Sequence, residues 1–239
     1  MNNLIQWPTA KYWTAQWNPV IGCKPCSPAC ENCYAAAWAK RFHKSFAPHV
    51  SSQMRPPRSG VVFCGNMTDL FGEWLSDDDV SIIISQTYNH TPNLFLTKRT
   101  ERMDIAANFD TKYGFRWFGM TAENQEWYDR RIKDFRSACL WHGWLSAEPL
   151  LGPIDLGLRY IAPEDQPFGW LVIGCESGPN RRPCKLEWVE SIVEQCRAAN
   201  VPVFVKQLDI GGKYVTDINK FPAHLRIRQV PWAKEGETK

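Results

Sequence analysis

Short runs of apolar residues recur along the chain, and each run ends in polar residues. The runs cover residues 61–65, 93–97, 115–120, 143–147, 170–174 and 201–205, with a shorter one near 17–21. Because most of their positions are apolar without strict alternation, the runs are typical of strands buried on both faces of a parallel sheet. The pattern therefore predicts about seven buried strands.

Longer stretches between these runs have the composition or spacing of helices. An alanine-rich stretch predicts a helix at 34–42, and N-cap residues at 76–79 predict one through 80–88. Three further amphipathic helices are expected, at 101–109, 124–139 and 186–199. Residues 48–57 are polar and interrupted by prolines, which indicates a loop.

Strands that alternate with helices favour a parallel sheet with the helices outside it. The chain is too short for a fully developed eight-fold barrel, so the expected fold is α/β, an incomplete TIM-type parallel barrel of about seven strand–helix units. A doubly wound sheet is the alternative, because alternation alone does not separate the two. No Gly- or Ser-rich linker divides the chain, so one domain over 1–239 is expected, with its core at about 14–208 and a C-terminal extension at 209–239.

The composition of the chain indicates the cellular compartment to expect and the role of its cysteines. The 239 residues include nine cysteines and twelve tryptophans and carry a formal net charge of +3. No apolar run is long enough to span a bilayer and no secretory signal is recognisable, so a cytoplasmic protein without membrane contact is expected. Cysteines stay reduced in that compartment, so a cluster of them indicates metal binding or catalysis. The small excess of positive charge is expected beside that cluster.

Four of the nine cysteines lie within eleven residues: Cys23, Cys26, Cys30 and Cys33. Zinc sites normally have a longer spacer between cysteine pairs, whereas iron–sulfur clusters accept tight spacing because the thiolates bind different irons. The loop is therefore predicted to hold an iron–sulfur cluster, with zinc as the alternative. The other cysteines are expected to pack as small buried residues: Cys64, Cys139, Cys175, Cys184 and Cys196.

Polar residues follow the predicted strands, and the carboxyl ends of parallel strands meet at one rim where chemistry gathers. The candidate catalytic groups at these ends are Glu123, Glu148, Glu176 and Lys206. Each carboxylate alone is equally suited to cap the following helix. The cations expected to give the rim a positive field are Lys98, Arg99, Arg181, Arg182 and Lys206. By contrast, Arg130, Arg131 and Lys133 are expected on the solvated face of a helix.

Nine stretches occur along the chain in this order: TAQWNPVIGCKPCSPACENCYA at 14–35, MTDLF at 67–71, LTKR at 96–99, ERM at 101–103, WFG at 117–119, ENQ at 123–125, EPLLGP at 148–153, GCESGP at 174–179 and residues 201–207. In these stretches the chain resembles a family of phage and prophage proteins that carry a three-cysteine motif and are regarded as similar to radical S-adenosylmethionine (SAM) enzymes.

The resemblance implies a 4Fe-4S cluster. The family's motif, Gly-Cys, six residues, Cys, two residues, Cys, places its ligands at Cys23, Cys30 and Cys33. The generic radical SAM spacing matches Cys26 in place of Cys23, so Cys26 remains an alternative or additional ligand. A fourth thiolate would close the iron that SAM needs. The chain also departs from the family's glycines at Ala29 and Cys175.

The resemblance also implies how SAM is held. In radical SAM enzymes the second strand end holds the methionine amino group, the fourth and fifth hold the ribose, and the sixth holds the adenine. Carried onto this chain, these positions are Gly65, Asn66, Thr68 and Asp69; then Thr121, Glu123 and Glu148; then Gly174 and Glu176.

The implied function is that of a radical SAM enzyme. Its reduced cluster would cleave SAM to a 5′-deoxyadenosyl radical, which abstracts hydrogen from an unknown substrate, with a nucleotide or nucleic acid as a candidate. An external electron donor would be its partner. One alternative is a non-catalytic module, with zinc or a closed iron–sulfur knot, that docks nucleic acid or a protein. Another is a barrel enzyme that binds SAM or a nucleotide without radical chemistry.

Overall fold

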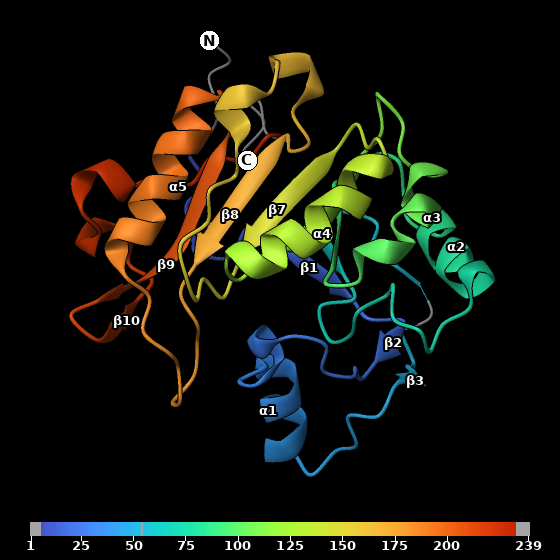
Figure 1. Ribbon diagram of the computed structural model, residues 1–239. Coiled ribbons are helices and arrows are strands. Elements are labelled where there is room, and N and C mark those ends of the chain that lie inside the picture. The colour runs from blue at the N-terminus through green and yellow to red at the C-terminus, as the bar shows by residue number, and fades with distance from the viewer. Residues whose placement is uncertain (1–5, 54, 233–239) are drawn as a thin grey trace.

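The computed structural model describes residues 6–53 and 55–232. Within them, eight strands form a mostly parallel sheet in the order β1-β4-β5-β6-β7-β8-β9-β10 (Figure 1). The strands are β1 Ala15–Trp17, β4 Val62–Cys64, β5 Asn93–Thr97, β6 Arg116–Thr121, β7 Gly143–Ala147, β8 Trp170–Gly174, β9 Val203–Ile210 and β10 Lys213–Val215. All neighbours pair in parallel except β9 and β10. A separate antiparallel pair joins β2 Val20–Ile21 to β3 His49–Val50.

The α/β fold with seven parallel strands confirms the coarse prediction from the sequence. The strands of the sheet follow one another in chain order, without the reversal that a doubly wound sheet contains. The carboxyl ends of the seven parallel strands therefore lie along one continuous edge. The predicted strand near 17–21 is instead two short strands, β1 and β2, in different sheets.

Helices connect the strands, and their ends follow local chemistry. The helices are α1 Tyr34–Arg41, α2 Asp77–Ser85, α3 Asp104–Ala107, α4 Gln125–Ser137 and α5 Leu186–Ala198. Helix α2 begins with a capping box in which Ser76 and Asp79 exchange hydrogen bonds. Helix α4 begins at Asn124, whose side chain accepts a hydrogen bond from the backbone N–H of Trp127. The helix expected at 101–109 is shorter, a 3₁₀ turn followed by α3.

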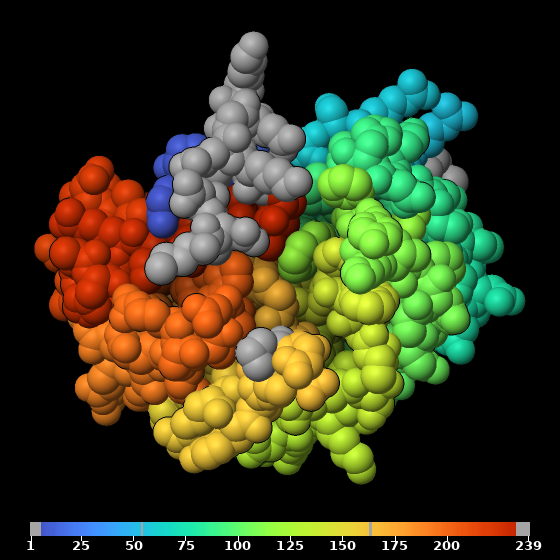
Figure 2. Space-filling model, turned by 90° about the horizontal axis from the view of Figure 1, so that it is seen from above, coloured from blue at the N-terminus to red at the C-terminus, as the bar shows by residue number. Residues whose placement is uncertain are grey.

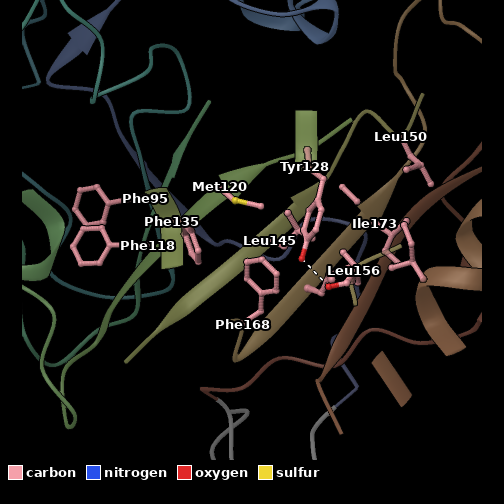
Figure 3. Packing of buried hydrophobic residues seen from close by; sticks show 14 of the residues in the cluster. Phe95, Phe118, Met120, Tyr128, Phe135, Leu145, Leu150, Leu156, Phe168 and Ile173 are labelled. Carbon is pink, nitrogen blue, oxygen red and sulfur yellow. Dashed lines mark hydrogen bonds between the residues drawn. The ribbon is translucent and has the colours of Figure 1, made fainter. Parts of the chain in front are cut away.

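The larger core lies between the sheet and its helices. Figure 1 shows α4 and α5 on the near side of the sheet. In this core the rings of Phe95 and Phe118, on neighbouring strands, stack with their centroids 5.0 Å apart (Figure 3). Tyr128 of α4 donates a hydrogen bond to the carbonyl oxygen of Leu156, as the dashed line in Figure 3 shows. This core fastens the helices to one face of the sheet.

The other face of the sheet is covered by aromatic residues from its own strands and from the segment before β1. Trp144 and Trp170 lie on this face, with Tyr12 packed edge-on against both. Gly119 leaves room for the Trp144 indole, because a Cβ there would lie 2.4 Å from the ring. Helices α2 to α5 pack on the first face, so much of the chain's tryptophan content serves to cover the second.

The two ends of the described chain meet. Gln6 forms an isolated bridge with Gln229, and Arg228 pairs in the same way with Phe204 of β9. In Figure 2 the blue N-terminal residues lie beside the red residues of the C-terminal segment. The extension expected from 209 contains the end of β9, β10 and two 3₁₀ turns, and its residues return to the sheet. Among the described residues, every helix is too short or too polar to cross a bilayer.

Four of the five scattered cysteines are buried as expected: Cys64, Cys175, Cys184 and Cys196. The expectation is wrong for Cys139, which is exposed. Cys139 follows the end of α4 with φ of 49°, in the left-handed region, and the turn places its side chain at the surface.

Candidate functional site

A cavity of about 450 Å³ lies at the carboxyl edge of the parallel sheet. Each of the seven parallel strands, or the loop that follows it, contributes to its wall. The residues at these strand ends are Cys23, Gly65, Asn66, Thr68, Asp69, Thr97, Lys98, Arg99, Thr121, Ser146, Glu148, Cys175, Glu176 and Lys206. Tyr12, Trp13 and Phe63 add aromatic surface from the helix-free face of the sheet. The predicted convergence of polar strand ends is therefore present in the structure.

The cysteine loop, residues 23–33, lies against this cavity. In Figure 1 the loop and α1 lie below the sheet, at the end toward which the arrows of β7 and β8 point. Cys23, Cys26, Cys30 and Cys33 are all reduced, all partly exposed, and all line the cavity. The thiols are not gathered into a preformed cage, since no group of three or more His, Cys, Asp or Glu among the described residues is placed to hold a metal ion.

The thiols differ in their tendency to ionise. The hydrogen bond from Cys26 lowers the pKa of Cys30 to about 4, against the opposing effect of burial and with the help of the Lys98 charge. The same hydrogen bond raises the pKa of Cys26. Burial, followed by the Asp69 charge, raises the pKa of Cys23 to about 11. Of these three thiols, Cys30 is the one most readily available as a thiolate, the form that binds metals.

Glu176 and Arg182 anchor the distal half of the cysteine loop to the end of β8. Glu176 Oε2 accepts hydrogen bonds from Asn32 Nδ2 at 3.0 Å and from the backbone N–H of Arg182 at 2.8 Å. The Arg182 guanidinium pairs with Glu176 and Glu31 and donates to the carbonyl oxygen of Pro28 at 3.0 Å. Burial raises the pKa of Glu176, but the hydrogen bonds from Arg182 and Asn32 outweigh it and hold the pKa below its ordinary value.

Arg99 anchors the proximal half of the loop to the ends of β4 and β5. Its guanidinium donates to the carbonyl oxygen of Lys24 at 2.9 Å and pairs with Asp69 at 3.2 Å and with Glu73 at 3.2 Å. Asp69 also accepts hydrogen bonds from the Thr97 hydroxyl and from the backbone N–H of Lys98. The predicted cofactor residue Asp69 is therefore fully engaged in holding neighbouring strand ends together.

The other predicted cofactor residues after β4 are Gly65, Thr68 and Asn66, and each has a different role. Gly65 has a positive φ of 74°, and a Cβ there would lie 2.6 Å from the Leu70 side chain, so the turn requires glycine. The Thr68 hydroxyl donates to the carbonyl oxygen of Gly22, just before the first cysteine. Asn66 Oδ1 is buried and has no hydrogen-bond partner within the described residues. A buried, unpaired acceptor at the cavity wall is suited to a ligand that donates a hydrogen bond.

Glu148 and Lys206 meet across the ends of β7 and β9. Lys206 Nζ and Gln207 Nε2 donate to the same oxygen of Glu148, at 2.5 and 2.8 Å. Lys206 Nζ also lies over the Trp13 ring, 5.4 Å from its centroid. Both charged side chains retain about a fifth of their exposure, and both line the cavity. The side chains of Glu148 and Lys206 can therefore contact a ligand bound in the cavity.

Glu123 and Gly174 are not among the residues that line the cavity. Glu123 is fully buried and pairs with Arg131 at 2.7 Å, so it fastens α4 to the end of β6. The expectation that Arg131 lies on a solvated face is therefore wrong, since its side chain is 3% exposed. Gly174 approaches Gln207 so closely that a Cβ would lie 2.6 Å from the amide nitrogen. It serves packing within the sheet.

The cations of the rim are largely neutralised. Arg99, Arg182 and Lys206 each pair with carboxylates, and Arg181 donates to the carbonyl oxygen of Gly212. Lys98 lines the cavity, and no ion pair of its side chain is present among the described residues. The uniformly positive rim expected from the sequence is thus an alternation of paired charges, because carboxylates of the same strand ends face the cations.

Comparison with known protein families gives one match. Residues 8–226 match the family described as "Protein of unknown function (DUF5131)". The chain belongs to this family. The match spans the cysteine loop and all the parallel strands, so the cavity lies entirely within the DUF5131 region. Searches of curated proteins and of solved structures gave no match.

Several residues of the DUF5131 cavity were not predicted from the sequence. Tyr12 and Trp13 reach it from the segment before β1, and Tyr34 lies directly after the last cysteine. The Tyr34 hydroxyl donates to the carbonyl oxygen of Asn66, which ties α1 to the turn after β4. The position of Tyr34 beside Cys33 was a signal in the sequence, whereas nothing in the local pattern of residues 12–13 indicates a place at the cavity.

Proposed function

We propose that this chain is a radical SAM enzyme whose site is the cavity beside the cysteine loop. The observation that carries the proposal is that the four thiols line the same cavity as the carboxyl ends of all seven parallel strands. The cavity volume lies within the range of about 300–1,000 Å³ usual for cofactor and ligand sites. The resemblance to phage and prophage three-cysteine-motif proteins supports the same conclusion.

The donor set fits an iron–sulfur cluster. Thiolates are the preferred ligands of iron in such clusters, and the Cys30 thiol ionises readily beside Cys26 and Lys98. Cys23, Cys30 and Cys33 would hold the cluster, with Cys26 as an alternative or additional ligand. When bound, the cluster would supply one electron that cleaves a C–S bond of SAM to give methionine and a 5′-deoxyadenosyl radical, which would abstract hydrogen from the substrate.

The chain's own residues would bind SAM and hold the loop in place. Asn66 Oδ1, which is buried and has no hydrogen-bond partner in the described part of the chain, is suited to accept a hydrogen bond from the amino group of the methionine part of SAM. Glu148 and Lys206 offer partly exposed polar groups for the ribose or the substrate. Glu176 and Arg182 would act as positioning residues, because their charges are spent on each other and on the cysteine loop.

The sheet supports the proposal at a coarser level. A sheet whose parallel strands follow chain order, with helices on one face, is the arrangement of an incomplete barrel of the radical SAM kind. Its helix-free face would be the barrel interior, here filled by tryptophans, and its carboxyl edge would be the open mouth. The chain would work in the cytoplasm with an external electron donor, and a nucleotide or nucleic acid is its candidate substrate.

Anaerobic reconstitution with iron and sulfide tests the proposal. We expect about four irons and four sulfides per chain, as in a 4Fe-4S cluster, and 5′-deoxyadenosine on reduction in the presence of SAM. A protein that binds no iron would contradict the proposal. A protein that binds SAM without cleaving it would instead favour a barrel enzyme without radical chemistry.

A second candidate function rests on Cys26. Because this thiol lines the cavity with the other three, four ligands are available, and four would close the metal site. The chain would then be a non-catalytic module, with zinc or a closed iron–sulfur knot, that docks nucleic acid or a protein partner. Metal analysis of the purified protein separates the two: one zinc per colourless chain favours the module, and a brown protein that contains iron and cleaves SAM favours the enzyme.

A further inference from the structure

The segment that follows the cysteine loop has an unusual distribution of charge. Between Glu31 and Asp69 the chain contains five lysines and arginines and no acidic residue. Since the whole chain has a net charge of +3, the rest of it carries a small negative charge. The five cations are Lys40, Arg41, Lys44, Arg55 and Arg58, and all are exposed. In the part of the chain that the structure describes, none of them forms an ion pair.

Helix α1, which begins this segment, presents its large side chains to solvent. Its buried residues are the alanines Ala35 and Ala39, whereas Tyr34, Trp38 and the C-cap residue Phe42 are 54%, 41% and 52% exposed. These three aromatic residues are spaced four apart, so they form one stripe along the helix. A helix that packs through alanine and exposes aromatic rings is the reverse of an ordinary amphipathic helix.

The exposed rings and cations are interleaved. The rings of Trp38 and Phe42 lie with their centroids 5.0 Å apart. Lys44 Nζ lies 5.1 Å from the centre of the Trp38 ring, and the Arg41 guanidinium lies 5.8 Å from that of Phe42. Aromatic rings that stack bases, flanked by cations that contact phosphates, are the combination with which proteins bind single strands.

We infer that the basic aromatic surface formed by Trp38, Phe42 and their neighbouring cations Lys40, Arg41 and Lys44 binds a single-stranded polynucleotide and leads it to the cavity. Tyr34, at the start of the same stripe, lines the cavity and donates a hydrogen bond to Asn66 at its wall. A strand stacked on Trp38 and Phe42 would therefore have its next base at the entrance. Stacking and phosphate contacts do not read the 2′-hydroxyl, so we expect DNA and RNA to bind alike.

The exposed cations, and the aromatic stripe that continues through Tyr34 to the cavity, favour a polynucleotide over other occupants of this surface. A membrane surface would take the rings into its apolar layer, away from the charged strand ends, Glu148 and Lys206, that line the cavity together with Tyr34. If the surface paired with itself, a second copy of the chain would bring Lys40, Arg41 and Lys44 of one copy against the same cations of the other. The polynucleotide neutralises these cations and also places a base at the candidate site. Only its role as the substrate rests on the proposed radical SAM function.

Fluorescence anisotropy with a labelled oligothymidylate of about a dozen nucleotides, and with the matching oligouridylate, tests the inference on the full chain. We expect binding that weakens with salt, with a log–log slope of up to about −2 if Lys40, Arg41 and Lys44 each contact a phosphate. Trp38→Ala and Phe42→Ala should each weaken binding about ten-fold, as expected for the loss of one stacked base. Lys40→Glu with Lys44→Glu should weaken binding further and flatten the slope.

Tyr160→Ala is the matched control, because this exposed ring also lies beneath an arginine, Arg159, 4.7 Å away, but on a different part of the chain. Equal weakening by Tyr160→Ala, or no measurable binding of either oligonucleotide, would overturn the inference. So would binding to anionic phosphatidylserine vesicles that Trp38→Ala abolishes while oligonucleotide binding is unchanged. SAM cleavage in the absence of substrate is measured separately on wild type and Trp38→Ala. Loss of oligonucleotide binding with SAM cleavage retained concerns the surface alone, whereas absence of SAM cleavage in wild type concerns the proposed radical SAM function alone.

Discussion

Cys26 is the residue that decides whether a cluster at the cysteine loop has an open or a closed iron. We expect Cys30→Ala to lose most of the iron taken up on anaerobic reconstitution, because it removes a ligand common to both cysteine patterns. We expect Cys26→Ala to keep its iron, because Cys23, Cys30 and Cys33 remain. Iron and sulfide analysis measures the difference, and Cys139→Ala, at an exposed site away from the cavity, is the control. Equal losses from Cys26→Ala and Cys30→Ala would contradict an open site.

Glu176 and Arg182 offer a prediction about stability and pH. The Glu176 carboxylate is 4% exposed, so Arg182→Ala would leave a buried charge unpaired and lower the free energy of unfolding by about 3 kcal/mol at neutral pH. The pKa of Glu176 is lower in the folded protein than in the unfolded chain, where it is about 4.3. The pair's contribution to the free energy of unfolding is therefore complete above that unfolded-state pKa and is lost as the pH falls through the folded-state pKa. The difference between wild type and variant should therefore shrink in acid.

Urea denaturation at neutral pH and at about pH 3.5 measures this difference, since the unfolded-state pKa of glutamate lies between them. Arg159→Ala, which breaks an exposed pair with Asp155, is the control and should change stability by less than about 1 kcal/mol at either pH. A difference between wild type and Arg182→Ala that does not change with pH would show that the pair with Glu176 is not its source.

Among the elements, α4 shows how a charged residue becomes part of the core. Tyr128, Arg131 and Phe135 are spaced three and four apart, so they share the buried side of the helix. That spacing could have predicted a buried Arg131, but the adjacent Arg130 and Lys133 made the stretch resemble a solvated face. Its partner Glu123 precedes the helix, where a carboxylate ordinarily caps the helix instead.

This buried pair should contribute strongly to stability. Arg131→Ala is expected to lower the free energy of unfolding by about 3–5 kcal/mol, because it leaves the Glu123 carboxylate buried without a cation. Arg130→Ala, at the preceding position, removes an exposed pair with Glu126 and a contact with the Trp127 ring, and should cost less than about 1 kcal/mol. Urea denaturation of the two variants compares them. Similar losses would mean that Arg131 does not pair as described.

Element boundaries were predictable where a single strong pattern governs the segment. The strands β5, β7 and β8 begin and end at the residues expected from their apolar runs. The pairs β2–β3 and β9–β10 were not predicted, because β2, β3 and β10 have only two or three residues and no apolar run marks them. Their pairing depends on loops that fold back, which local sequence does not specify.

For the whole molecule, the helix-free face of the sheet depends on the segment before β1. Tyr12 is 2% exposed and packs against Phe63, Trp144, Trp170 and Phe204 on four strands. We expect Tyr12→Ala to lower the free energy of unfolding by about 3–5 kcal/mol, as large aromatic truncations in cores do. Tyr113→Ala, at a site 85% exposed, should change it by less than about 0.5 kcal/mol. Comparable losses from the two variants would mean that Tyr12 does not close this face.

The residues of the candidate site could be predicted from the sequence, but the hydrogen bonds and ion pairs that join them could not. The cysteine loop and the polar strand ends follow from residue types and from the rule that parallel strands end at one edge. The anchors of the loop could not be inferred, because they join residues far apart in the sequence, such as Asn32 to Glu176 and Lys24 to Arg99. For the same reason the sequence did not show that the rim cations are paired with carboxylates.

The central claim is that the cysteine loop and the strand ends form one site for an iron–sulfur cluster and SAM. Its most direct test is the yield of 5′-deoxyadenosine when the reconstituted protein is reduced in the presence of SAM, compared between wild type and Cys30→Ala. The account predicts that wild type forms 5′-deoxyadenosine and that Cys30→Ala forms none. A wild-type protein that retains its iron and forms no 5′-deoxyadenosine would contradict it.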